Sequence, residues 1–392
     1  MYKYLFFLGN NPSISLAEIQ AKFDNPSLSI LSEKTVLLNL AQPLAKPQTI
    51  LDTMGGTIRI AKFINTFSFS DIQDLLVQFL STNFLDIRDI GISYYNFSRH
   101  ISKQLIQTKK TLRQDCHINK RFIFENNQSE LKAATLKKNK LIGKGIELTL
   151  IKCDDSITIG QTVAIQDIDQ YSLRDYGKPK PDTFSGMLPP KLAQMMLSLA
   201  HLQPGQTVYD PFCGSGVVLQ EALLQNMQII GSDISEKAVI HTRENLKWLI
   251  KKFHLLIPDY HHLMEKNIFP ADATYYQLAD QVDAIVTEPY LGPAHSTLPT
   301  DQFASQIIQN ITPIYSQFII NSLRYLKPNG YLVFIIPLIK TNTNQRHSIN
   351  LESLLDSTIK EAYNLIQFDN RDLIYEQPEQ KVLRRLVVLQ KN

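Results

Sequence analysis

Four acidic residues in the second half of the chain stand at points where short apolar stretches end. Asp210 closes VYD and is followed directly by PFCGSG, and Asp233 closes QIIGSD. Asp272 follows in IFPAD, and Glu288 closes DAIVTE. A carboxylate accepts hydrogen bonds from hydroxyl and amine groups and pairs with cations. If the apolar stretches are parallel strands, the four acids meet at one edge of a sheet and can hold a ligand that carries several such groups.

The segment after Asp210 contains Gly214 and Gly216, which let the backbone pass close to a ligand before a helix that we expect to begin at about Val217. A dinucleotide fingerprint has the spacing G-x-G-x-x-G directly after the strand, so that helix amides meet a pyrophosphate. Here the spacing is D-P-F-x-G-x-G, and a carboxylate would repel phosphates. The pattern therefore favours S-adenosylmethionine, whose ammonium and sulfonium are positive, over a nicotinamide dinucleotide.

We assign one part of this cofactor to each of the first three acids. Asp210 is expected to bind its amino-acid end, Asp233 to accept from both ribose hydroxyls, and Asp272 to accept from the adenine amino group. A single acid at a strand end is more often a helix cap or a turn residue. Three in one sheet, the first with a Gly-x-Gly loop, favour the binding site. The predicted cofactor residues of this region are Asp210, Phe212, Gly214, Gly216, Asp233, Ile234, Asp272 and Ala273.

The fourth acid belongs to the segment VTEPYLG, in which we predict catalysis by Glu288, Pro289 and Tyr290. Methylation of an exocyclic amine requires the nitrogen to attack the sulfonium methyl in line, while an acceptor draws on the amine protons. Glu288 provides the acceptor, Pro289 leaves neighbouring carbonyls exposed, and Tyr290 can stack on a base. A simple turn after a strand is the alternative. The segment contains no cysteine, which argues against methylation of pyrimidine carbon 5 through a thiolate.

The elements that must position these residues alternate regularly between strand and helix. The apolar stretches TVYD, MQIIGSD, DAIVTEP and YLVFIIP are each separated from the next by a segment with helical periodicity. Such alternation predicts an α/β domain, a parallel sheet covered by helices on both faces, with its ligand beyond the carboxyl ends of the strands.

Basic charge is concentrated upstream of this domain. Residues 95–152 contain thirteen Lys/Arg and four Asp/Glu, a balance of +9 in a chain whose net charge is +3, so the rest is negative. Aromatic residues are interleaved with the basic runs. A patch of this kind predicts binding to nucleic acid, with phosphates supplying affinity rather than sequence choice. A solvated basic face is the alternative.

Composition limits the protein class. No run of about 18 apolar residues occurs, and the first residues are poorly suited to a signal peptide, so we expect a soluble, cytoplasmic protein. Cys116, Cys153 and Cys213 are far apart and form no CxxC, which excludes a disulfide framework and a zinc knuckle. We expect Cys213 to serve packing. A chain of 392 residues predicts more than one domain. The predicted parts are an N-terminal α+β domain (1–75), a basic domain (76–166), a linker (167–182) and the α/β domain (183–392).

The motifs DPFCGSG and TEPYLG, with the acids between them, resemble the amino-methyltransferase class of Rossmann-like enzymes, whose fourth motif is usually Asp-Pro-Pro-Tyr. More specifically, YLFFLGNNPSISLAEI, IGKGIEL and DIDQYSLRDYGKPKPDTFSGMLPPKLAQMMLSLA resemble the THUMP-domain tRNA guanosine-N2 methyltransferases. The resemblance covers nearly the whole chain. It implies a class I methyltransferase domain preceded by a ferredoxin-like plus THUMP α+β region that binds RNA.

The resemblance also implies further site residues. The segment before the catalytic domain is expected to line the methionine side of the cofactor through Thr183, Phe184, Ser185, Gly186 and Leu188. The fourth motif departs from the usual pattern. If the segment is aligned as T-E-P-Y-L-G, Glu288 takes the place of the usual Asp. If Tyr290 is instead aligned with the tyrosine of the usual motif, Thr287 takes the place of that Asp. We prefer the first alignment because it keeps the carboxylate and the glycine.

We therefore expect methyl transfer from S-adenosylmethionine to the exocyclic N2 of a guanosine in tRNA, at position 10, with the target nucleotide flipped out of its stem. The partners expected are tRNA and a small activating subunit, for a protein that is otherwise monomeric and has no membrane partner. The alternatives are a DNA amino-methyltransferase acting on adenine N6 or cytosine N4, and a non-catalytic RNA-binding protein with a vestigial cofactor site.

Overall fold

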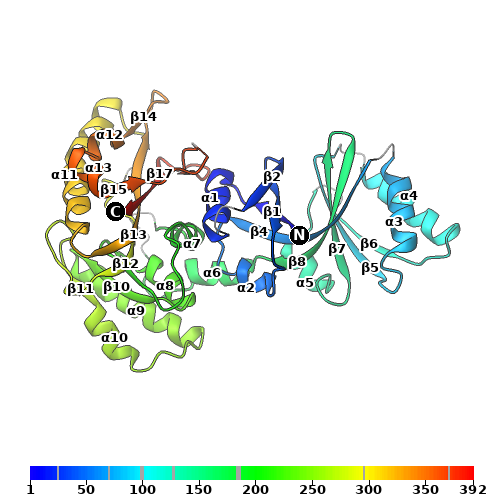
Figure 1. Ribbon diagram of the computed structural model, residues 1–392, viewed down its shortest axis with the longest axis horizontal. Helices are drawn as coiled ribbons and strands as arrows, with labels where there is room; N and C mark the ends of the chain where they lie inside the picture. Colours follow the sequence, from blue (N-terminus) through cyan, green and yellow to red (C-terminus); the bar gives the residue numbers. More distant parts are fainter. Residues whose placement is uncertain are drawn as a thin grey trace. The chain divides into compact units, whose positions relative to one another are not determined.

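The computed structural model divides into two compact units, whose elements are labelled in Figure 1. It describes residues 1–23, 26–68, 71–97, 101–125, 129–181, 187–294, 296–369 and 371–392. The first unit comprises Met1–Pro12, Pro26–Asp52 and Thr57–Ile168, and the second Ser13–Asn25, Thr53–Gly56 and Asp169–Asn392. Within the described ranges, we find no helix long and apolar enough to cross a membrane.

The first unit is built on one sheet with the strand order β2-β3-β1-β4-β8-β7-β5-β6. Strand β5 runs parallel to both β6 and β7, and the other neighbouring pairs are antiparallel. The strands are β1 (Tyr2–Leu8), β2 (Ser27–Ser32), β3 (Thr35–Leu40), β4 (Thr57–Ser68), β5 (Asp89–Tyr95), β6 (Arg121–Ile123), β7 (Ile146–Cys153) and β8 (Ser156–Ile165).

Two amphipathic helices cover the β5–β7 part of this sheet. Leu76 of α3 (Ile72–Thr82) and Leu105 of α4 (Ile101–Gln114) join one buried cluster with Ile92 and Leu148 of the sheet. Asp71 caps α3 by accepting from the amides of Gln73 and Asp74. The shorter helices of the unit are α2 (Pro47–Leu51) and α5 (Ala133–Lys138).

A buried polar network links four neighbouring strands of this sheet. Glu147 of β7 pairs with Arg59 of β4 at 2.9 Å and accepts at 2.5 Å from Ser93 of β5 and from Thr162 of β8. Groups of this kind are tolerated in a core only when each polar atom has a partner. The network therefore fixes the register of β4, β8, β7 and β5 as one sheet.

The second unit is a nine-stranded sheet whose main order is β11-β10-β9-β12-β13-β17-β15. Strands β11, β10, β9, β12 and β13 run parallel to one another, whereas β17 is antiparallel to β13 and β15. The chain order reverses between β9 and β12, and in such sheets ligands bind beyond the carboxyl ends of the strands at this point. The strands are β9 (Thr207–Asp210), β10 (Gln228–Asp233), β11 (Ile268–Pro270), β12 (Val282–Thr287), β13 (Leu326–Lys340), β14 (Arg346–Ser348), β15 (Tyr363–Leu365), β16 (Ile374–Tyr375) and β17 (Val382–Lys391).

Helices cover both faces of this sheet because side chains alternate along each strand. Val208 belongs to one buried cluster, with helices α7, α8, α9 and α1, and Tyr209 to the other, with α11. The alternation of strands and helices that the sequence predicted is thus confirmed. The helices are α1 (Pro12–Lys22), α6 (Ile168–Tyr176), α7 (Pro190–Leu199), α8 (Val217–Leu224), α9 (Glu236–Lys252), α10 (Tyr260–Asn267), α11 (Asp301–Ser322), α12 (Leu351–Leu354) and α13 (Ser357–Ala362).

The predicted domain limits, after residues 75, 166 and 182, remain a prediction. Strands from both 1–75 and 76–166 belong to the same sheet, and the predicted linker 167–182 contains helix α6. From Ser13 onward, helix α1 belongs to the second unit, although it lies within the segment predicted as the N-terminal domain.

Candidate active site

The side chain of Asp210 ends strand β9 and is buried, with 2% of its surface exposed. Its Oδ1 accepts from the Thr287 hydroxyl at 2.6 Å and from the Phe212 amide at 3.2 Å. Burial raises the pKa of this carboxyl to about 7; these hydrogen bonds oppose the shift, and the nearby charges of Asp233 and Glu288 add to it. Asp210 is thus a buried acid that a positively charged ligand group would stabilise in its ionised form.

The loop between β9 and α8 requires its two glycines. Gly214 has φ +52° and Gly216 has φ +80°, both in the left-handed region. A Cβ atom on Gly216 would lie 2.9 Å from the Thr242 side chain, whose hydroxyl donates to the Gly214 carbonyl at 2.8 Å. Helix α9 therefore holds the loop in place through Thr242. Cys213 of the loop is buried and belongs to the apolar cluster of Val208, in line with the packing role expected from the sequence.

Asp233 closes the neighbouring strand β10 and faces the same loop. Its carboxylate accepts from the Gly214 amide at 3.0 Å and from the Ser235 amide at 2.9 Å. Burial raises the pKa of Asp233, and the two amide bonds oppose that shift. Asp272 Oδ1 accepts from both the amide and the hydroxyl of Thr274, at 2.9 and 2.6 Å. Like Asp210 and Asp233, it accepts from the amide two residues further on, as in an Asx turn, in addition to facing the site.

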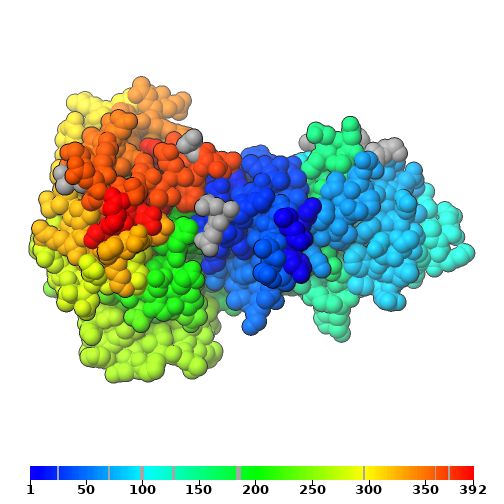
Figure 2. All heavy atoms as spheres, viewed as in Figure 1, coloured from blue at the N-terminus to red at the C-terminus, as the bar shows by residue number. Residues whose placement is uncertain are grey.

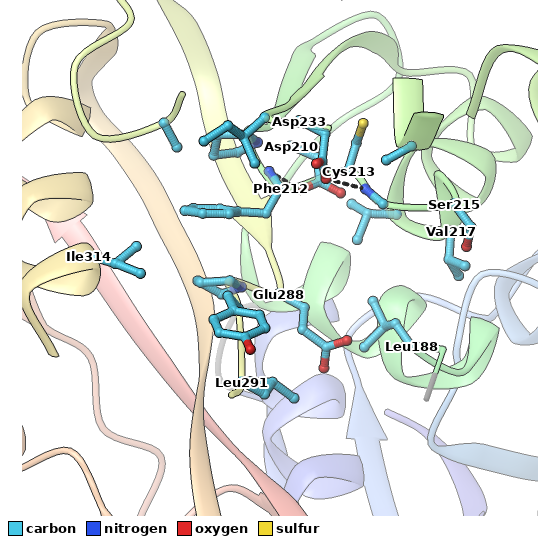
Figure 3. Close-up of a pocket in the computed structure, with 18 of the residues that line it drawn as sticks. Leu188, Asp210, Phe212, Cys213, Ser215, Val217, Asp233, Glu288, Leu291 and Ile314 are labelled. Atoms are coloured by element: carbon cyan, nitrogen blue, oxygen red, sulfur yellow. Dashed lines mark hydrogen bonds between the residues drawn. The ribbon is translucent and has the colours of Figure 1, made fainter. Parts of the chain in front are cut away.

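A cavity of about 500 Å³ brings the predicted residues together (Figure 3). Phe212, Leu188, Leu291 and Ile314 give it apolar walls, between which the carboxylates lie. Gly216 is at the start of α8, next to the lining residues. Thr183 and Ser185, like Phe184 and Gly186, lie outside the described residues. The predicted site residues that line the cavity are Leu188, Asp210, Phe212, Gly214, Asp233, Ile234, Asp272, Ala273, Glu288, Pro289 and Tyr290.

At the end of β12, Glu288 is bound by a residue that the sequence analysis missed. Its Oε1 accepts from Arg384 Nε at 2.6 Å and its Oε2 from Arg384 Nη2 at 3.5 Å. Arg384 belongs to β17, and no short-range signal connects it with the fourth acid. Tyr290 is half exposed at the cavity, and its carbonyl accepts from the buried Tyr315 hydroxyl at 3.3 Å.

Asn245 of α9 is a second residue that the sequence analysis missed. Its side chain exchanges hydrogen bonds with the amide and carbonyl of Lys180 and donates to the Ser215 carbonyl, each at 2.9 Å. It therefore fastens the chain just upstream of 182–186 to the loop of the cavity. That residues 183–186 line the cofactor stays a prediction.

The lining fits S-adenosylmethionine chemically. Carboxylates at the ends of β9 and β10 can meet its positive amino-acid end and its ribose hydroxyls, and the apolar walls can enclose the adenine ring. The role of each residue remains a prediction.

Comparisons with known proteins give methyltransferases. A family model described as "DNA methylase" matches residues 29–244, and one described as "RMKL-like, methyltransferase domain" matches residues 178–324. The chain also resembles the crystal structure of TrmN from Thermus thermophilus, with a TM-score of 0.54, 16% identity and full coverage of both chains. At this identity the likeness shows the fold alone.

The names of individual sequence relatives are more specific than the descriptions of the family models. A tRNA (guanine(10)-N2)-dimethyltransferase of Methanothermobacter thermautotrophicus is 31% identical over 47% of each chain. One of Methanocaldococcus jannaschii is 28% identical over 53% of this chain and 54% of its own. The protein named "Probable tRNA (guanine(10)-N2)-dimethyltransferase" of Methanothermococcus thermolithotrophicus is 32% identical over 37% of this chain and 78% of its own. The chain spans about half the length of the first two relatives. It belongs to the methyltransferase family that the DNA methylase model describes and to the family of the tRNA (guanine(10)-N2)-dimethyltransferases.

Proposed function

We propose that this protein transfers a methyl group from S-adenosylmethionine to the exocyclic N2 of a guanosine in tRNA, at position 10. The observation that carries the proposal is the convergence of Asp210, Asp233 and Glu288, from the ends of three strands, on one cavity at the switch point of the sheet. The names of the sequence relatives favour tRNA over DNA as the substrate.

When bound, the cofactor supplies an electrophilic methyl group. Asp210 and Asp233 hold its amino-acid end and its ribose, and the half-exposed ring of Tyr290 stacks on the target base. Glu288 accepts a hydrogen bond from the N2 amine, which orients the amine and stabilises the positive charge that develops on the attacking nitrogen. The apolar walls exclude water from the reacting atoms.

In this proposal, the first unit binds the tRNA backbone. Lys137, Lys140 and Lys144 line a second cavity of about 500 Å³ around the apolar side chains of Leu136 and Ile142. In Figure 2 this segment projects at the lower edge of the first unit (blue-green). Lys137 ends α5 next to Lys138 and pairs with Asp167 at 3.0 Å, and Lys140 and Lys144 follow the helix. Exposed ammonium groups of this segment suit phosphates. We propose that the protein acts as a monomer apart from a small activating subunit.

Replacement of Glu288 by Gln tests the catalytic assignment. Gln keeps the shape but removes the charge, so single-turnover methyl transfer at saturating cofactor and tRNA should slow by about 10² to 10³, or about 3 to 4 kcal/mol. Cofactor affinity by calorimetry should be unchanged. The matched control is Glu265→Gln, an exposed residue of α10, which should transfer at the wild-type rate.

The outcomes separate the alternatives. If Glu288→Gln lowers the transfer rate by less than about tenfold, Glu288 acts only as a neutral hydrogen-bond acceptor. A wild-type rate in the variant would assign the role to the carbonyls near Pro289 or to Thr287. Transfer to duplex DNA but not to tRNA would support the DNA enzyme. Cofactor binding without transfer to either, with cell extract added to supply a missing subunit, would support a non-catalytic RNA-binding protein.

A further inference from the structure

Arg384 holds the Glu288 carboxylate from behind the cavity wall. The guanidinium contacts both carboxylate oxygens, at 2.6 Å from Nε and 3.5 Å from Nη2. The Arg384 side chain is 6% exposed, whereas that of Glu288 is 17% exposed. Glu288 lines the cavity and Arg384 is not among its lining residues. Arg384 therefore contacts the site through Glu288 and not by lining the cavity itself.

The fold fixes Arg384 more firmly than an ordinary surface arginine. It lies in β17, where its backbone is in register with Pro337 of β13 on one side and Tyr375 of β16 on the other. The next residue, Arg385, is 32% exposed and pairs with the more exposed Asp372. Neighbouring residues of a strand point to opposite faces, so the chain places one arginine toward the site and the other away from it. A buried guanidinium is strongly disfavoured unless a partner compensates it, and here the partner is Glu288.

The pair leaves part of the carboxylate available. An ionised carboxylate has about four lone-pair positions, and the Arg384 fork occupies about two of them. A glutamate side chain also has one more rotatable bond than aspartate, so its carboxylate has more positions to choose from. The fork restricts these positions, and because Glu288 lines the cavity, its remaining lone pairs are the acceptors that it can offer to an amine there.

We propose that Arg384 is a positioning residue, which holds the Glu288 carboxylate in the orientation that receives the amine of the target base. The proposal rests on the proposed function. It predicts that the effect of Arg384 on methyl transfer passes through Glu288, whereas a purely structural role would act whether or not that carboxylate is present.

The test is a double-mutant cycle of Arg384→Met and Glu288→Gln in the full chain, measured by single-turnover methyl transfer with cofactor and tRNA saturating. Arg384→Met alone should slow transfer by about 10 to 100-fold and leave the cofactor Kd within about twofold. In the Glu288→Gln background the same change should slow transfer by less than about threefold. Arg384→Lys should restore part of the rate, because it returns the charge without the fork.

The matched control is Arg385→Met, which removes a neighbouring arginine from the other face and should keep the rate within about twofold. Equal slowing by Arg384→Met in both backgrounds, or a wild-type rate in Arg384→Met, would overturn the positioning role. If Arg384→Met does not fold, Arg384→Lys is carried through the same cycle, with the same criterion of a smaller effect in the Glu288→Gln background. A wild-type rate in Glu288→Gln alone would instead refute the proposed function of the carboxylate, so the two failures are distinguishable.

Discussion

The hydroxyl of Thr287 donates a 2.6 Å hydrogen bond to the buried carboxylate of Asp210. Thr287 is the last residue of β12 and Asp210 the last of β9, so this bond joins the two strands at the switch point of the sheet. Thr287 precedes Glu288 directly, and the bond therefore ties the expected cofactor acid to the expected catalytic segment. A buried acid held by a hydroxyl and an amide costs stability when it is ionised, and that cost can be measured.

Asp210→Asn is expected to stabilise the protein without cofactor at alkaline pH. Burial raises the pKa of Asp210 to about 7, so its contribution to stability is present below the unfolded pKa and is lost as pH rises toward and through 7. Asn has no charge to bury and keeps an acceptor for Thr287. The advantage of the variant in urea unfolding should grow by roughly 2 to 3 kcal/mol between pH 5 and pH 8. A constant difference at the two pH values would contradict this origin.

Affinity for S-adenosylmethionine should rise with pH for the same reason. A positive amino-acid end binds the ionised form of Asp210, and that form becomes common only as pH approaches 7. Between pH 5.5 and 7, below the titration of the ligand's own amino group, calorimetry should show about tenfold tighter binding. Adenosine, which lacks the amino acid, should show a smaller pH dependence, because burial raises the pKa of the ribose-binding Asp233 as well. Equal pH dependence for the two ligands would place the titrating group elsewhere.

Asp233→Ala should severely weaken cofactor binding. The substitution removes the acceptor for two ribose hydroxyls, at about 1.5 to 3 kcal/mol each, and it releases the Gly214 amide of the loop. Calorimetry on the folded variant measures the weakening. Asp280→Ala, which removes an exposed acid of the same unit, is the control and should bind as wild type. Unchanged affinity in Asp233→Ala would show that another group binds the ribose.

Neutralising Lys137, Lys138 and Lys140 together should weaken tRNA binding and flatten its salt dependence. The slope of log K against log salt should fall by roughly 0.7 to 0.9 for each phosphate that these lysines no longer neutralise. Cofactor affinity should stay the same. The control removes three other exposed lysines, Lys251, Lys252 and Lys266 of the second unit, for an equal change of charge. If both triple variants change the slope equally, the first unit provides only a solvated basic face.

Local patterns in the chain were enough to predict the α/β class of the second unit and the cluster of acids at its binding edge. Strand and helix periodicity are local, and parallel strands present their carboxyl ends at one edge, so the sequence alone predicted that Asp210, Asp233 and Glu288 lie together, as they do in the cavity. Gly214 and Gly216 were predicted only to let the backbone pass close to a ligand; the structure shows that both also adopt the left-handed region, which favours glycine.

What those acids contact depends on the folded chain. Arg384 lies 96 residues after Glu288. The sequence does not distinguish Arg384 from Arg385, and only the pairing of β17 within the sheet decides which of the two faces the site. The network around Glu147 likewise joins strands from segments that the sequence analysis separated. Partner choice among distant charged residues depends on which strands become neighbours and which faces they bury. Periodicity fixes the faces of each element, but strand order and register fix the pairs.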